Sequence, residues 1–312
     1  MSRLADLAEL VRAPAALSVP GDVLAGAAAA GTLDRRTPAL AGASVLLYWA
    51  GMAGNDWADR RLDAVERPER PIPSGRVRPA AALGLAAGLT AAGVALATAA
   101  GGRRAAAVAV PLAAAIWGYD LLAKDTAAGP AVMAACRGLD VLLGASPGPG
   151  GSGRGTGSGR SRRSGRSVAR TAGRAVPAGR GLLRAVPAAL TVAAHTWTVT
   201  ALSRREVSGA DRRLPQATLA GTALVAATAL GRADPVPMAL AAGYATRYGG
   251  AQARVLADPS PPRVRAAVGA GITGLPALQG ALTARAGARL LGLAVAAAAP
   301  LGRRLARLIS PT

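Results

Sequence analysis

The stretch that decides the fold of this chain reads Asn55-Asp56-Trp57-Ala58-Asp59-Arg60-Arg61-Leu62-Asp63, and it follows directly on the apolar segment 38–54. If the helix of that segment continues through the stretch, Asp56, Asp59 and Asp63 lie at positions i, i+3 and i+7 and share one face. Converging carboxylates repel one another unless a cation joins them. Mg²⁺ is the natural counter-charge, because it takes carboxylate and substrate phosphate oxygens. A solvated loop whose acids balance nearby arginines would explain the charge but not the spacing.

Apolar segments separated by short polar gaps recur on both sides of this stretch. The 312 residues are 51% hydrophobic and 17% charged, whereas an ordinary soluble domain has roughly 25% charged residues. A membrane-spanning helix needs about 20 mainly apolar residues. The candidate segments are 10–29, 38–54, 79–100, 105–122, 128–145, 182–203, 216–230, 237–256, 264–282 and the short 288–301. We therefore predict an all-α integral membrane bundle of about nine transmembrane helices, with the lipid bilayer as its solvent.

The segment 146–181 differs from the rest because it is rich in Gly, Ser and Arg and has no apolar periodicity. Such a composition cannot bury enough surface to offset chain entropy, so we expect a disordered loop. The loop would be an insertion in a single transmembrane domain that comprises residues 1–312. The N-terminus lacks the layout of a signal peptide, so we expect the first apolar segment to be retained.

The net charge of +21 would suggest nucleic acid on a soluble chain. Here the arginines cluster between apolar segments, which is typical of the cytoplasmic loops of membrane proteins. We therefore expect a multi-pass protein of the cell membrane and no nucleic-acid partner. The loops 60–78, 204–213 and 263–265 would share the cytoplasmic side, whereas the Arg-containing insertion would fall outside, against the trend. One Cys and one His exclude an internal disulfide and a structural zinc site.

The residues from Asn55 to Arg76 closely resemble the first aspartate-rich motif of the UbiA prenyltransferase superfamily. The pattern is Asn-Asp-x-x-Asp-x-x-x-Asp followed by Arg-Pro-x-Pro-Ser-Gly-Arg. A second patch, Tyr119-Asp120-Leu121-Leu122-Ala123-Lys124, is similar to the family's Tyr-x-x-x-x-Lys segment, in which the lysine is taken to face the diphosphate. The resemblance implies a UbiA-like fold.

The resemblance also implies a Mg²⁺-dependent enzyme that moves a prenyl group from a polyprenyl diphosphate to an aromatic or other lipophilic acceptor. On this hypothesis Asp56, Asp59 and Asp63 hold the metal and Asn55 orients the diphosphate. Lys124, together with Arg70 or Arg76, would neutralise the diphosphate charge, and Tyr119 would contact the substrate. Close alternatives are transfer of a phosphoribosyl group to a polyprenyl phosphate, and a non-catalytic carrier of a lipid or metabolite.

Three further groups of polar residues lie within apolar segments. Arg137 and Asp140 form either a self-neutralising pair at i, i+3 or part of a polar, substrate-binding cavity. Asp22, with Arg12 near the start of its segment, is a candidate for the same polar cavity. His195 is either a packed side chain that is hydrogen-bonded across helices or a contact for the acceptor.

The chain departs from the family pattern where a second aspartate-rich motif is expected. The stretch reads Ser203-Arg204-Arg205-Glu206-Val207-Ser208-Gly209-Ala210-Asp211 and lacks the usual pair of aspartates. Either Arg204 or Arg205, with Glu206, completes the site and holds phosphate oxygens, or diphosphate chemistry has been lost and the fold carries a lipid-linked substrate. This form is similar to the EboC-like branch of the superfamily, of the actinobacterial type.

Overall fold

The computed structural model describes residues 3–146, 180–230 and 234–298, and this part of the chain contains helices but no strands. Most of the predicted insertion, residues 147–179, lies outside the described residues. In chain order the elements are α1 Arg3–Leu10, η1 Ala13–Ser18, α2 Pro20–Ala30, α3 Thr37–Glu66, α4 Pro79–Gly118, η2 Tyr119–Ala123, α5 Gly129–Gly144, α6 Arg180–Ser203, α7 Arg213–Ala229, α8 Pro235–Tyr244, η3 Ala245–Gly249, α9 Gly250–Ala257 and α10 Pro261–Arg285. A further helix, Arg289–Ala298, follows α10.

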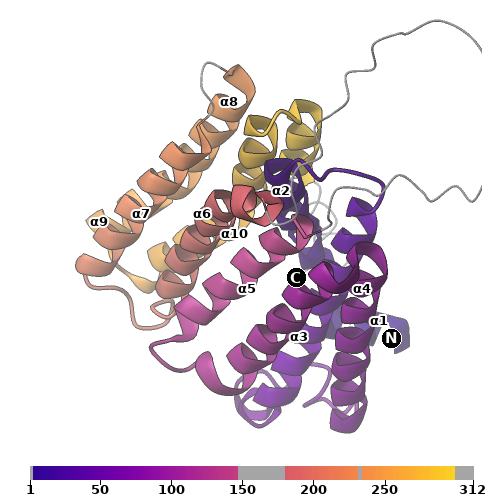
Figure 1. Cartoon of the computed structure of the whole chain (residues 1–312). Coiled ribbons are helices and arrows are strands. Elements are labelled where there is room, and N and C mark those ends of the chain that lie inside the picture. The colour runs from indigo at the N-terminus through magenta and orange to yellow at the C-terminus, as the bar shows by residue number, and fades with distance from the viewer. Residues whose placement is uncertain (1–2, 147–179, 231–233, 299–312) are drawn as a thin grey trace, which may run out of the picture.

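The long helices run side by side as a bundle (Figure 1), and their connections alternate between two ends. At one end, Arg265 donates to the Glu206 carbonyl oxygen at 2.8 Å and Ala210 N–H donates to the Pro259 carbonyl oxygen at 3.1 Å. At the opposite end, the Thr32 hydroxyl donates to the Gly144 carbonyl oxygen at 3.2 Å. The prediction of an all-α bundle is confirmed, and the arginine-rich loops 204–213 and 263–265 lie at the same end.

Helix α4 is a hairpin of two helical limbs. Gly102 interrupts it with φ 66° and ψ −158°, in a region where glycine has no steric penalty. The limbs then run antiparallel, because the Trp117 indole N–H donates to the Thr90 hydroxyl at 3.1 Å. The two limbs correspond to the predicted segments 79–100 and 105–122.

The N-terminal region differs from the single span that was predicted for 10–29. The structure divides it into α1, the 3₁₀ helix η1 and α2. Arg12 has φ 48° and is the one non-glycine residue with positive φ in the described part of the chain. Pro20 begins α2, a position that suits its fixed φ. The break matters for function because it turns the Arg12 side chain toward the end of α3.

Two helical stretches of the described residues meet the length and apolarity needed to cross a membrane, Pro79–Ala123 and Arg180–Ser203. The apolar core has two main parts, one among α2 to α5 and one among α6 to α10. Helices α2 and α5 pack backbone to backbone, since a Cβ on Gly26 would lie 1.7 Å from the Val141 carbonyl oxygen. Small residues permit such contacts between membrane helices.

Candidate active site

The acidic stretch lies on the last turns of α3, which continues without a break to Glu66, as predicted. Asp56 Oδ1 accepts hydrogen bonds from Arg12 at 2.9 Å and from Arg70 at 3.3 Å. Arg70 also donates to Asp63 Oδ2 at 2.7 Å. Asp56 and Asp63 are buried, so they share one helix face and one bridging guanidinium. Unpaired carboxylates at this depth would be costly.

Asp59 lies on the same segment but has a different partner. Its carboxylate forms an ion pair with Lys124, which follows the π-helical turn η2. The Asn55 side-chain amide donates to the other oxygen of Asp59 at 3.4 Å. The structure thus brings the first motif and the Tyr-x-x-x-x-Lys segment together, as the resemblance implies.

Arg76 closes the loop after α3 against the N-terminal helix. Its guanidinium donates to Asp6 and to Glu9, each at 2.7 Å, and to the Glu69 carbonyl oxygen at 2.6 Å. The hydrogen bonds to Glu9 and Asp6 raise the pKa of Arg76 above its ordinary value. Arg76 therefore fixes α1 and the loop beside the acidic stretch, while Arg70 faces the buried carboxylates.

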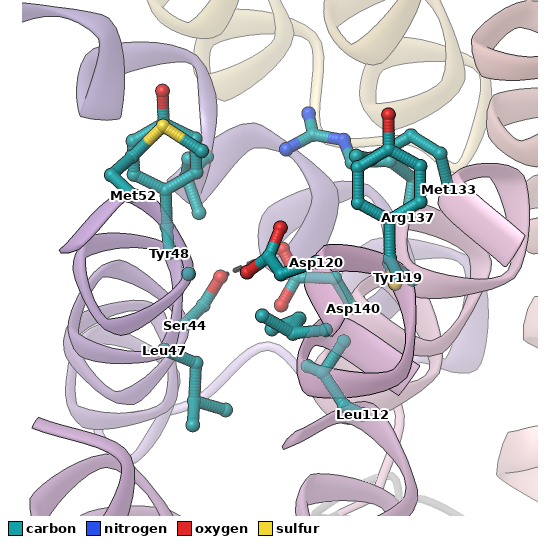
Figure 2. Close-up of a pocket in the computed structure, with 14 residues that line it drawn as sticks. Ser44, Leu47, Tyr48, Met52, Leu112, Tyr119, Asp120, Met133, Arg137 and Asp140 are labelled. Atoms are coloured by element: carbon teal, nitrogen blue, oxygen red, sulfur yellow. Dashed lines mark hydrogen bonds between the residues drawn. The ribbon is translucent and has the colours of Figure 1, made fainter. Parts of the chain in front are cut away.

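A cavity of about 110 Å³ begins one helical turn inward of these ion pairs. It lies between α3, α4, η2 and α5, and most of its wall is apolar or aromatic (Figure 2). The lining side chains include Leu47, Tyr48, Met52, Leu112, Tyr119 and Met133. Tyr119, which was predicted to contact the substrate, thus lies in the cavity wall.

The inner wall of the cavity carries a buried polar network. Arg137 Nε lies 2.9 Å from Asp22 Oδ2, and the Gln279 amide donates to Asp22 Oδ1 at 2.6 Å. Asp140 accepts a hydrogen bond of 2.7 Å from the Ser44 hydroxyl. Arg137 and Asp140 therefore pair with other helices rather than with each other, and both line the cavity, which favours the second interpretation of this pair.

Asp120 is a site residue that the sequence interpretation noticed but did not select. It is buried, lines the cavity and points into it beneath Tyr119 (Figure 2). Its sequence signal is the same as that of Asp56, an acid directly after an apolar segment. The sequence interpretation associated Arg12 with Asp22, whereas in the structure Arg12 forms an ion pair with Asp56.

The stretch after α6 contributes arginines to the same end of the bundle. Arg204 is exposed and donates to the Thr126 carbonyl oxygen in the loop that follows η2. Arg205 is exposed, and Glu206 is half-buried. Burial raises the pKa of Glu206 above its ordinary value, and the positive charge of Arg265 reduces this rise. Arg204 thereby lies next to the Tyr119 segment.

The carboxylate oxygens at the end of α3 are ligands of the kind that Mg²⁺ prefers. No three acidic, His or Cys side chains form a ligand set for a metal among residues 3–146, 180–230 and 234–298. Mg²⁺, however, is usually held by one or two carboxylates plus substrate phosphate oxygens. Within the described part of the chain Asp56 Oδ2 accepts no hydrogen bond, whereas both oxygens of Asp63 accept from Arg67 and Arg70. Both oxygens of Asp59 are bonded as well, but its side chain is 22% exposed against 1% for Asp63, so Asp56 and Asp59 are better placed than Asp63 to receive a metal.

Comparisons with known proteins find relatives that match part of this chain. Digeranylgeranylglyceryl phosphate synthase of Methanothrix thermoacetophila is 44% identical over 80 residues, which is 25% of this chain and 30% of that protein. The same enzyme of Natronomonas pharaonis is 44% identical over 85 residues, or 27% of this chain and 31% of that protein. The chain thus matches less than a third of the length of these relatives.

Two solved structures share the fold at low identity. One, described as giving insight into digeranylgeranylglyceryl phosphate synthase in membranes, superposes with a TM-score of 0.61 at 16% identity and covers 92% of this chain and 99% of that one. The apo structure of a UbiA homologue from Aeropyrum pernix K1 has a TM-score of 0.60 at 18% identity and covers 89% and 96%. The assignment to the EboC-like branch stays a prediction. The model of the UbiA prenyltransferase family matches residues 18–270, and the chain therefore belongs to this family of membrane-embedded proteins.

Proposed function

We propose that this chain is a magnesium-dependent prenyltransferase that moves a prenyl group from a polyprenyl diphosphate to an aromatic or other lipophilic acceptor. One observation carries the proposal: an apolar cavity lies directly inward of a rim of paired acids and bases. The cavity suits a hydrocarbon chain, and the rim suits a diphosphate. The acceptor is not carried over from the relatives, because the matched regions are short.

The rim residues would act on the leaving diphosphate. Lys124, Arg12 and Arg70 are each bonded to a carboxylate in the ligand-free arrangement. On binding, the diphosphate would share these cations, which stabilise the negative charge as the carbon–oxygen bond breaks. Asp56 and Asp59 would hold Mg²⁺, whose bound charge supplies Lewis-acid stabilisation of the same oxygens. Asn55 would keep Asp59 in position through its amide.

The cavity wall would protect the reactive carbon. Tyr48, Met52 and Met133 line the space with bulky, mainly apolar surface that would exclude water. Exclusion of water prevents hydrolysis of the allylic cation before the acceptor reacts. Tyr119 stands where the cavity meets the rim, so it would contact the first part of the prenyl chain.

A transfer assay tests the proposal. The purified protein in liposomes would be given Mg²⁺, geranylgeranyl diphosphate and a set of hydroxylated aromatic and glycerol-lipid acceptors. Asp59→Asn keeps the size of the side chain but removes the charge that pairs with Lys124 and would hold the metal. We expect kcat/KM to fall by about 10²–10³-fold, and removal of Mg²⁺ by chelation to abolish product formation by the unmodified protein.

The matched control is Asp258→Asn, because Asp258 is an exposed acid at the same end of the bundle whose partners, Arg263 and the Ser260 N–H, lie in its own segment. Its activity should stay within twofold. Absence of a prenylated product with every donor and acceptor, together with absence of Mg²⁺-dependent diphosphate binding, would contradict the proposal. Lipid binding that survives Asp59→Asn unchanged would favour the non-catalytic carrier, and a phosphoribosylated lipid detected by mass spectrometry would favour the phosphoribosyl alternative.

A further inference from the structure

Asp120 differs from the other buried carboxylates of the described residues. Each of the others has a hydrogen bond or an ion pair with a side chain: Asp6 with Arg76, Asp22 with Arg137, Asp56 with Arg12, Asp63 with Arg70 and Asp140 with Ser44. Asp120 as a residue is 5% exposed, and its carboxylate has neither in the described part of the chain. A buried polar group without a partner is rare in native structures and calls for a functional explanation.

The π-helical turn η2 gives Asp120 its position. Lys124 N–H donates to the Tyr119 carbonyl oxygen at 3.0 Å, which closes the wider turn. Single π-turns inside helices are frequent at functional sites. The turn directs the carboxylate toward α3, where a Cβ on Gly54 would lie 3.6 Å and one on Gly51 3.9 Å from Asp120 Oδ2. These are ordinary contact distances, so the Asp120 carboxylate lies directly against the glycine face of α3.

In the proposed function, Asp120 lies next to the end of the prenyl diphosphate that reacts. Gly54 precedes Asp56 by roughly 3 Å along the helix axis. Asp120 thus lies about one turn inward of the rim that would hold the diphosphate. Asp140, the other acid of the cavity wall, is bonded to Ser44, which lies roughly 18 Å from Asp56 along α3.

The charged groups that face Asp120 form no ion pair with it among the described residues, so its carboxylate can accept a proton. Lys124 on its own segment, Arg12 before η1, and Asp56 and Asp59 on α3 all lie within electrostatic range. From α5 the thiol of Cys136 faces it. The two cations are already bonded to Asp59 and Asp56, so neither ion-pairs with Asp120.

We propose that Asp120 is the catalytic base that takes the proton released by a protic acceptor, an inference that rests on the proposed function. The bond between C1 of the prenyl group and the diphosphate oxygen breaks, and its electron pair leaves with the diphosphate. C1 forms a new bond to the oxygen or ring carbon of the acceptor. The hydrogen on that atom passes as a proton to the Asp120 carboxylate, which later releases it to water. The acceptor is therefore a hydroxyl compound or an activated aromatic ring.

The test separates transfer from binding in the full-length protein in liposomes. With Mg²⁺, geranylgeranyl diphosphate and the acceptor that gives product in the transfer assay, Asp120→Asn should lower kcat by about 10²–10⁴-fold, the usual contribution of a general base. KM for the diphosphate and the slow hydrolysis of the diphosphate without acceptor should stay within threefold. Asp120→Glu, which retains a carboxylate, should recover at least a tenth of the lost rate. Asp125→Asn, on the exposed side of the same loop, serves as the control for a lost charge.

The outcomes distinguish the two proposals. If the unmodified protein forms no product with any acceptor, both proposals are overturned. If transfer by the unmodified protein is normal and Asp120→Asn retains kcat within threefold, the inference alone is overturned. It is also overturned if Asp120→Asn loses diphosphate binding in parallel with transfer, because Asp120 would then be a ligand of the diphosphate or its metal. The thermal unfolding midpoint of each variant shows that the fold is retained.

Discussion

The two connections that follow α3 and α6 lie at the same end of the bundle but carry opposite chemistry. At the end of α3, buried acids each have a basic partner, and Arg70 joins two of them. After α6, the exposed Arg204 donates to a backbone carbonyl oxygen, and the loop 204–213 carries four arginines against two acids, Glu206 and Asp211. The half with α3 thus supplies both signs of charge, and the half with α6 supplies mainly cations.

The interiors of the two halves also differ, because one holds a cavity and the other is filled by packed rings. Around α3 and α5 there is a cavity with charged groups in its wall. Around α6, the corresponding space is filled by His195, Tyr244 and Tyr248, whose ring centroids lie 5.4 to 6.0 Å apart. In the proposed function, the metal and diphosphate chemistry would therefore belong to the N-terminal half, and the C-terminal half would be its packed support.

Among the changes that compare the two halves, the largest effect is expected when the Arg70 bridge of the acidic half is removed. Arg70→Met leaves Asp63 with only the 3.4 Å contact to the more exposed Arg67. Removing one partner of a buried pair costs roughly 3–5 kcal/mol. Because Arg70 is partly exposed, we expect a loss of about 2 kcal/mol in the free energy of unfolding and about 10²-fold in kcat/KM. Thermal unfolding in detergent and the transfer assay measure the two effects.

Arg67→Met is the matched control for this change. Its guanidinium is half exposed, so its loss should alter stability by less than about 0.5 kcal/mol. Arg70→Lys keeps the charge but cannot reach two carboxylates with a planar fork, so it should recover only part of the loss. Full activity and stability in Arg70→Met would show that Asp56 and Asp63 do not depend on this bridge.

A change in the packed half should affect stability and leave catalysis alone. His195 Nδ1 and the Tyr244 hydroxyl are 2.9 Å apart and buried, and His195 does not line the cavity. His195→Phe should lower the free energy of unfolding by about 1–3 kcal/mol, because a buried hydroxyl loses its partner. In the double variant with Tyr244→Phe much of this loss should be restored. The cycle of four proteins gives the coupling energy, and a large fall in kcat would make His195 an acceptor contact instead.

The bundle could be predicted from sequence because a lipid environment requires long apolar helices. The reversal at Gly102 also falls in the predicted gap between 100 and 105. The spacing of Asp56, Asp59 and Asp63 places them on one face if the helix continues through them, and α3 does continue to Glu66.

The pairing of charged residues could not be predicted in the same way, since it depends on which helices meet. Asp140 bonds to Ser44, 96 positions away, and Asp22 bonds to Gln279, 257 positions away. The local i, i+3 spacing of Arg137 and Asp140 suggested the wrong partners. The break at Arg12 escaped notice because an apolar run of sufficient length fits a straight helix equally well.

The smallest effect is expected in the connection after α6, where Arg204 and Arg205 are neighbouring cations. Arg204 lies beside the Tyr119 segment, whereas the Arg205 side chain contacts no partner among the described residues. If Arg204 takes the place of a missing acidic motif by holding a phosphate oxygen, Arg204→Gln should raise KM for the diphosphate roughly fivefold, or about 1 kcal/mol for an exposed charge. Arg205→Gln should stay within twofold, and high salt should reduce the difference between the two variants. Equal effects of the two changes would mean that the loop supplies only a diffuse positive potential, so that diphosphate binding depends on the α3 half alone.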